Sequence, residues 1–309
     1  MNVLFWGTQS LFAQRTLFGL SQCHDLQAVM VPAPSTQMRP VQQFTTQPAH
    51  GNPHKLPATT SALAAQLQLP IYGIHRLRHA ETTAFLRSLA PDLVCVACFP
   101  WRIPPALLAI PTFGFVNLHP SLLPAYRGPA PLFWQLRDGL RTIGITAHWM
   151  DATFDTGDIV AQQTFLLPDG AGAPEIDAAL ADIGVTLLAS LLTDLAAGIT
   201  PRQQQPPGGT RHSWPTAADF ALDPAWSARH AFAFMRGTAE WQQPYSIVQS
   251  DHALALHTAL AYDASASQSQ FIVAQASHVA IQFTPGVLFA TRTPTIGQRF
   301  PTDITLEME

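Results

Sequence analysis

The chain has 309 residues, of which 47% are hydrophobic and 12% are charged, and its formal net charge is −4. This composition excludes a predominantly disordered chain, which needs low hydrophobicity and a high net charge. Twenty acidic against sixteen basic residues leave no general positive field of the kind that many nucleic-acid-binding proteins show. The length predicts about two domains.

The cysteines Cys23, Cys95 and Cys98 are too few, and odd in number, for a disulfide framework. Cys95 and Cys98 form a C-x-x-C pattern inside an apolar run. Residues three apart on a strand point to opposite faces, so this pair would be a poor redox dithiol or metal clip. We expect both to be small buried hydrophobic residues.

The first residues lack the charged segment and cleavage site of a signal peptide, and no run of 18 or more apolar residues occurs. We therefore expect a cytoplasmic protein with no membrane partner.

The N-terminal pattern predicts a strand over residues 3–6, a helix over 11–20 and a second strand over 27–31. Such a βαβ unit is typical of a parallel sheet with helices on its faces. Only Gly7 lies in the first turn, so the G-x-G-x-x-G of a dinucleotide site is absent. This absence argues against a nicotinamide-dependent oxidoreductase. Residues 32–58 are polar and without periodicity, which predicts a long loop.

The same alternation of elements continues to residue 197. Helices are predicted at 61–69, 82–89, 104–108, 131–140 and 175–197, and strands at 92–99, 115–119, 143–150 and 159–165. We expect a catalytic domain over residues 1–200 with an α/β fold, a Rossmann-like mostly parallel sheet with helices on both faces.

Residues 201–215 are rich in Pro, Gln and Gly and predict a linker. A helix over 226–236 follows, and then alternating apolar stretches at 245–249, 253–260, 271–274, 279–283 and 287–289. Short strands of this kind predict a small C-terminal β-barrel (OB-like) domain over residues 216–309.

The residues best suited to chemistry gather around one predicted strand. Asn117 and His119 are two apart, so both side chains emerge on one face near the carboxyl end of that strand, where open α/β sheets bind ligands. Asp155 lies in a polar segment after the next strand and could orient or charge the imidazole. An amide donor, a histidine and a carboxylate suit attack on a carbonyl group, in which an oxyanion develops and a proton is moved.

The segments NLHPSLLPAYRG (117–128) and MDATFDTGD (150–158) resemble the signature of the 10-formyltetrahydrofolate-dependent formyltransferases. The opening VLFWGT (3–8), the APDLV segment (90–94) and residues 99–107 are also similar. Residues 220–245 are more faintly similar to the start of the C-terminal barrel in the methionyl-tRNA formyltransferase branch.

This resemblance implies roles for individual residues. Asn117 and His119 would hydrogen-bond the formyl oxygen as it becomes an oxyanion, while Asp155 would orient His119 and help to take the proton of the attacking amine. The folate would be bound by residues of three loops: Phe99, Pro100, Trp101 and Arg102; Ser121, Leu122, Leu123 and Pro124; and Asp151, Ala152, Thr153 and Phe154. Arg127 would either contact the folate tail or the acceptor, or brace its own loop. The donor would be 10-formyltetrahydrofolate, and no metal is implied.

The acceptor amine is left open. Initiator methionyl-tRNA is one candidate, but residues 210–309 contain five arginines against eight acids, and phosphate binding needs clustered Lys and Arg. In the tRNA-specific branch the loop after the second strand is typically basic, whereas here residues 32–58 hold only Arg39 and Lys55, with His50 and His54. The alternatives are N-formylation of a small amine such as an amino sugar nucleotide, and hydrolysis of the donor. A folate-binding protein without turnover is a further alternative, which an intact Asn117, His119 and Asp155 argue against.

Overall fold

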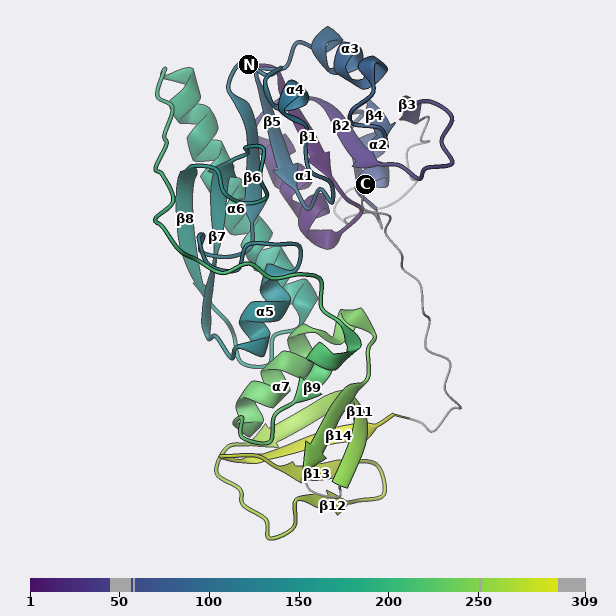
Figure 1. Cartoon of the computed structure of the whole chain (residues 1–309), viewed down its shortest axis with the longest axis vertical. Helices are drawn as coiled ribbons and strands as arrows, with labels where there is room; N and C mark the ends of the chain where they lie inside the picture. The colour runs from purple at the N-terminus through teal and green to yellow at the C-terminus, as the bar shows by residue number, and fades with distance from the viewer. Residues whose placement is uncertain (45–56, 58, 250–251, 294–309) are drawn as a thin grey trace. The chain divides into compact units, whose positions relative to one another are not determined.

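The computed structural model describes residues 1–44, 57, 59–249 and 252–293. Two compact units make up the chain (Figure 1). The first comprises Met1–Pro215 and Arg236–Glu240, and the second comprises Thr216–Met235 and the residues from Trp241 onward.

The first unit is built on an eight-stranded sheet with the order β3-β4-β2-β1-β5-β6-β7-β8. The strands are β1 Val3–Gly7, β2 Leu26–Pro32, β3 Val41–Phe44, β4 Ile71–Ile74, β5 Leu93–Ala97, β6 Gly114–His119, β7 Thr142–Trp149 and β8 Ile159–Leu166. Strands β4, β2, β1, β5 and β6 pair in parallel. Strands β3, β7 and β8 add antiparallel edges. The expected mostly parallel α/β sheet is therefore confirmed.

Helices cover both faces of this sheet, as predicted (Figure 1). Helices α1 Leu11–Cys23, α2 Thr60–Gln66 and α6 Ala173–Ala196 lie on one face, where α1 contacts both α2 and α6. Helices α3 Ala80–Ser88 and α4 Pro105–Leu108 lie on the other face, and α5 Pro131–Arg137 follows β6. Side chains alternate along the strands, so Leu4 and Trp6 of β1 share one core with Leu86 of α3 and Leu107 of α4.

Helix α6 is the one helix, among the described residues, that is long and apolar enough to cross a membrane. Its apolar side chains pack inside the protein: Ile176, Leu180, Leu188 and Leu195 are buried, and the helix contacts α1, β7 and β8. Gly184 lies where α6 closely approaches Leu118 and Ile145 of the sheet. These contacts are those of a core helix.

The sequence-based expectations fail at two places in this unit. Part of the segment predicted as a loop over 32–58 forms β3, which pairs with β4, a strand that was not predicted. Residues 45–56 and 58, including His50, His54 and Lys55, lie outside the described residues.

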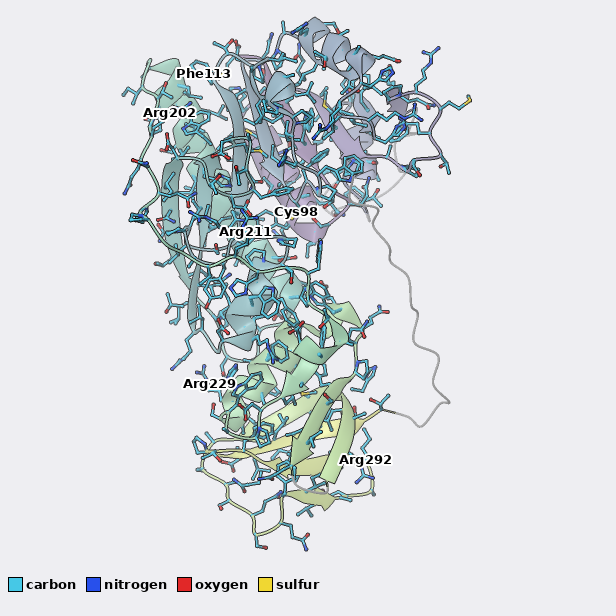
Figure 2. The ribbon with its side chains drawn as sticks, viewed as in Figure 1. Cys98, Phe113, Arg202, Arg211, Arg229 and Arg292 are labelled. Carbon is cyan, nitrogen blue, oxygen red and sulfur yellow. The ribbon has the colours of Figure 1, made fainter. Side chains whose placement is uncertain are left out.

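The expectation that both residues of the C-x-x-C pattern are buried is wrong. Cys95 is buried within β5, but Cys98, labelled in Figure 2, follows the strand and is exposed.

The second unit is a six-stranded sheet with the order β12-β13-β14-β11-β10-β9 and one main helix, α7 Ala228–Gly237. The strands are β9 Ala221–Leu222, β10 Tyr245–Gln249, β11 His252–Asp263, β12 Ile272–Ala274, β13 Val279–Gln282 and β14 Val287–Arg292. All pairs except β9–β10 are antiparallel. Phe220, Phe234 and Tyr245 form an aromatic core between the helix and the sheet. This half-barrel confirms the expected small β domain.

Candidate active site

Strand β6 presents its polar side chains on the face opposite α6. Phe115, Asn117 and His119 alternate with residues that face the other way, and Phe115 packs into the core under α3 and α4. In the antiparallel pair of β6 and β7, Asn117 lies directly opposite His148. Residues directly opposite each other in such a pair share one face of the sheet, so this register brings their side chains together.

The imidazole of His119 is almost fully buried, with 4% of the residue exposed. Its Nε2 lies 2.9 Å from the carbonyl oxygen of Tyr126, and its Nδ1 lies 3.6 Å from Oδ1 of Asp155. Because a carbonyl oxygen can only accept, Nε2 carries a proton and donates it to this bond. The other nitrogen, Nδ1, faces the carboxylate, and a second proton there would create an ion pair.

Asp155 comes from the loop between β7 and β8, and its two carboxylate oxygens have different surroundings. Oδ2 accepts a hydrogen bond from the backbone N–H of Gly128 at 2.9 Å, and Oδ1 lies between the imidazoles of His119 and His148. Its backbone is in the left-handed region, with φ of 60°. The structure thus brings Asn117, His119 and Asp155, which are up to 38 positions apart in the sequence, into one cluster.

His148 belongs to the same cluster, although it was not among the site residues predicted from the sequence. Its Nδ1 donates to the carbonyl oxygen of Trp149 at 2.9 Å, and its Nε2 lies 3.1 Å from Nδ2 of Asn117. Burial is the main cause that lowers the pKa of His148 to about 4, so the ring is neutral at physiological pH. With its single proton on Nδ1, the ring accepts through Nε2 from the Asn117 amide.

A pocket opens beside this cluster on the face of the sheet that carries Asn117. It is lined by aromatic and apolar side chains together with polar groups of the β7–β8 loop; of the twelve predicted folate-binding residues it includes Phe99, Trp101, Arg102, Asp151, Thr153 and Phe154. Asn117, His148 and Asp155 also line it. The pocket therefore joins half of the predicted binding residues to the polar cluster.

The other six predicted binding residues do not line this pocket: Pro100, Ala152, Ser121, Leu122, Leu123 and Pro124. Around Leu123 the backbone groups are bonded within the protein, since the N–H donates to Oγ1 of Thr146 and the carbonyl oxygen accepts from Nε2 of Gln162. Their contact with folate remains a prediction.

The guanidinium of Arg127 donates hydrogen bonds to neighbouring loops of the same chain. Nε donates to the carbonyl oxygen of Asp155 at 3.1 Å, NH1 to that of Gly208 at 3.4 Å, and NH2 to Oε1 of Gln205 at 2.6 Å. Of the two roles expected for Arg127, this arrangement favours bracing of the loop over contact with a ligand. No group of three or more His, Cys, Asp or Glu side chains in the described part of the chain is arranged to hold a metal ion.

Comparison with known proteins gives a consistent result. Residues 3–192 match the formyl transferase family. A methionyl-tRNA formyltransferase from Pelotomaculum thermopropionicum is 32% identical over 244 residues, which is 78% of this chain and 73% of the relative.

Two solved structures share the fold at low identity. An N-formyltransferase from Helicobacter canadensis, in complex with folinic acid and dTDP-3-aminofucose, has a TM-score of 0.66 at 12% identity and covers 94% of this chain and 99% of its own. The methionyl-tRNA formyltransferase from Clostridium thermocellum has a TM-score of 0.56 at 16% identity, with 84% and 93% covered. With a family match across most of the α/β unit and the polar cluster at its centre, the chain belongs to the formyl transferase family of enzymes.

Proposed function

We propose that this enzyme transfers the formyl group of 10-formyltetrahydrofolate to a primary amine, in the cytoplasm, and that the reaction takes place in the domain of residues 1–200. The observation that carries the proposal is that Asn117 and Asp155 line one pocket and that His119 lies directly against Asp155. An amide donor, an imidazole and a carboxylate at one point are the groups that acyl transfer to an amine requires.

The pocket suits a flat heteroaromatic donor. Phe99 and Trp101 meet edge to face with their ring centroids 5.5 Å apart, and Phe154 is 39% exposed on the β7–β8 loop. Such apolar walls with a few polar groups are typical of small-molecule sites. Arg102 is exposed at this pocket and would meet the carboxylates of the folate tail.

In the proposed reaction each group of the cluster has a chemical task. The acceptor amine attacks the formyl carbon, the new C–N bond forms, and the bond from that carbon to N10 of the folate breaks. Asn117 donates a hydrogen bond through Nδ2 to the oxygen that gains charge, and the imidazole of His119, held against Asp155, stabilises the same charge. Asp155 orients the His119 ring and takes the proton of the amine, directly or through a water, for delivery to N10.

Methionyl-tRNA is the first candidate acceptor. It is favoured by relatives of that name, among them one that is 32% identical over 78% of this chain. The charge of the chain argues the other way, since residues 210–309 contain five arginines against eight acids. An amino sugar nucleotide is therefore the second candidate, and its phosphates would need fewer cationic contacts than a tRNA.

The proposal is tested by assaying formyl transfer from 10-formyltetrahydrofolate to initiator methionyl-tRNA and to dTDP-3-aminofucose, each across a salt series. Transfer to the tRNA that falls steeply with salt would identify the first acceptor, because phosphate contacts release counterions. Transfer to the sugar nucleotide alone would identify the second. Binding of tetrahydrofolate without transfer to any primary amine would contradict the proposed reaction.

A further inference from the structure

Residues 201–213, here called the strap, lie along the catalytic loops. Two backbone hydrogen bonds join the strap to Arg127: the Arg127 N–H donates to the carbonyl oxygen of Thr210 at 3.0 Å, and the His212 N–H donates to the carbonyl oxygen of Arg127 at 2.9 Å. Arg211 of the strap donates through NH2 to the carbonyl oxygen of Phe154 at 2.8 Å (Figure 2). The strap therefore contacts both the loop after β6 and the loop between β7 and β8.

Gln205 is the strap residue whose side chain reaches the backbone of the catalytic aspartate. Its Nε2 donates to two carbonyl oxygens, that of Asp155 at 2.9 Å and that of Gly157 at 2.8 Å. Its Oε1 accepts from NH2 of Arg127 at 2.6 Å. Only one orientation of the amide satisfies these contacts, because two carbonyl oxygens require a donor and a guanidinium requires an acceptor.

The group that Gln205 holds is in an uncommon conformation. Asp155 has φ of 60°, in the left-handed region that is unfavourable for L-residues, although Asp tolerates it better than most. Gln205 Nε2 and Arg127 Nε both donate to its carbonyl oxygen. At the other end of the residue, Oδ2 accepts from the Gly128 N–H and Oδ1 faces His119. The hydrogen bonds to the backbone carbonyl oxygen of Asp155 therefore also orient the bond from its Cα to its side chain.

We propose that Gln205 is a positioning residue for the reaction: it clamps the backbone of Asp155, together with Arg127, so that the carboxylate stays against His119. The proposal rests on the role of Asp155 in the proposed function. Gln205 lies 50 positions after Asp155. It also lies beyond residue 192, where the match to the family ends. The strap, which holds this aspartate in position, is therefore separate from the segment that contains Asn117, His119 and Asp155.

Two substitutions at Gln205 separate its contacts. Gln205→Met keeps the length of the side chain and removes every hydrogen bond, whereas Gln205→Glu keeps an acceptor for Arg127 and removes the N–H donors to Asp155 and Gly157. Gln204→Ala is the matched control, since Gln204 is the same residue type at the preceding position and is exposed.

We expect kcat to fall roughly 10- to 100-fold in both Gln205 variants, because small displacements of a catalytic group have effects of that size, while KM for the folate changes little. Gln204→Ala should turn over like the wild type. Equal kcat in all four proteins would overturn the proposal, as would a loss of activity that only follows a loss of folded protein in a thermal denaturation curve.

A second readout does not depend on activity. The Gly128 N–H donates to Oδ2 of Asp155, so its hydrogen exchange measured by NMR reports whether the carboxylate is held. Faster exchange at Gly128 in both Gln205 variants, and not in Gln204→Ala, is the expected result; unchanged exchange would refute the clamp. If the wild type transfers formyl to no amine while Gly128 responds in this way, the proposed function fails and the clamp stands.

Discussion

Asn117 donates through Nδ2 to Nε2 of His148, across the pair of strands β6 and β7, at 3.1 Å. The direction of this bond follows from the other side of the ring, where Nδ1 donates to the carbonyl oxygen of Trp149. A neutral His148 therefore fixes which end of the Asn117 amide is the donor. In the proposed reaction, the second N–H of the same Nδ2 would donate to the formyl oxygen of the donor.

Replacing His148 tests this relationship. His148→Leu removes the acceptor, so the Asn117 amide is free to present its oxygen to the site, and we expect kcat to fall about tenfold, the equivalent of one hydrogen bond of about 1–1.5 kcal/mol. His148→Gln, which can accept through Oε1, should retain more of the activity. Steady-state kinetics on the two variants checks the prediction, and equal activity in His148→Leu and the wild type would contradict it.

The lowered pKa of His148 also predicts how stability changes with pH. The unfolded chain takes up a proton at the ordinary pKa of 6.5, whereas the folded protein does so only near pH 4. Between these values the unfolded state binds more protons, so the contribution of His148 makes the folded state less stable as the pH falls from 6.5 to 4. Urea denaturation at pH 7 and pH 5 should therefore show a smaller loss of unfolding free energy in His148→Gln than in the wild type. An equal loss in both proteins would show that His148 does not titrate in this way.

Removing the donor of the oxyanion site should affect turnover far more than folding. Asn117 is partly buried on β6. We expect Asn117→Ala to lower kcat by about 10²–10³, the usual effect of deleting one such donor. Circular dichroism and tetrahydrofolate binding serve as controls for the fold and the pocket. Near-wild-type turnover with the fold intact would remove Asn117 from the proposed chemistry.

The close approach of the strap to the catalytic loop predicts a sensitive glycine. Gly128 has φ of 120°, and a Cβ there would collide with the carbonyl oxygen of His212 in the strap. Gly198 has φ of 77° with no atom near a Cβ, so Gly198→Ala carries the conformational cost alone, about 1–2 kcal/mol. We expect Gly128→Ala to lower the unfolding free energy by more than Gly198→Ala and to reduce kcat as well. Chemical denaturation compares the two variants, and an equal loss would contradict the close approach.

The sequence predicted those parts of the site that lie within one element or one motif. Asn117 and His119 were found because a strand places residues two apart on one face. His148 could not be selected, because its role depends on the register between β6 and β7, which the periodicity of a single strand does not specify. Gln205 lies in a segment without periodicity and acts through its side chain on a distant backbone, and local patterns carry no signal for such a contact.

In the fold, too, elements with a strong local pattern were predicted, and elements that depend on long-range pairing were missed. The strongly apolar strands and helices were predicted close to their observed bounds. The short edge strand β3 and its neighbour β4 were not, because β3 is polar at two of its four residues and pairs only with β4. Cys98 was expected to be buried with the strand, but the strand ends at Ala97.

The proposed reaction and the role of Asp155 are tested together by single-turnover formyl transfer by the wild type and by Asp155→Asn, with tetrahydrofolate affinity measured on both. Asn tolerates the left-handed backbone of Asp155 and keeps its shape, so the substitution removes mainly the charge beside His119. We expect transfer to a primary amine by the wild type, a rate lower by about two or more orders of magnitude in Asp155→Asn, and equal folate affinity in both proteins. Transfer at the wild-type rate by Asp155→Asn would contradict the proposed role of this carboxylate.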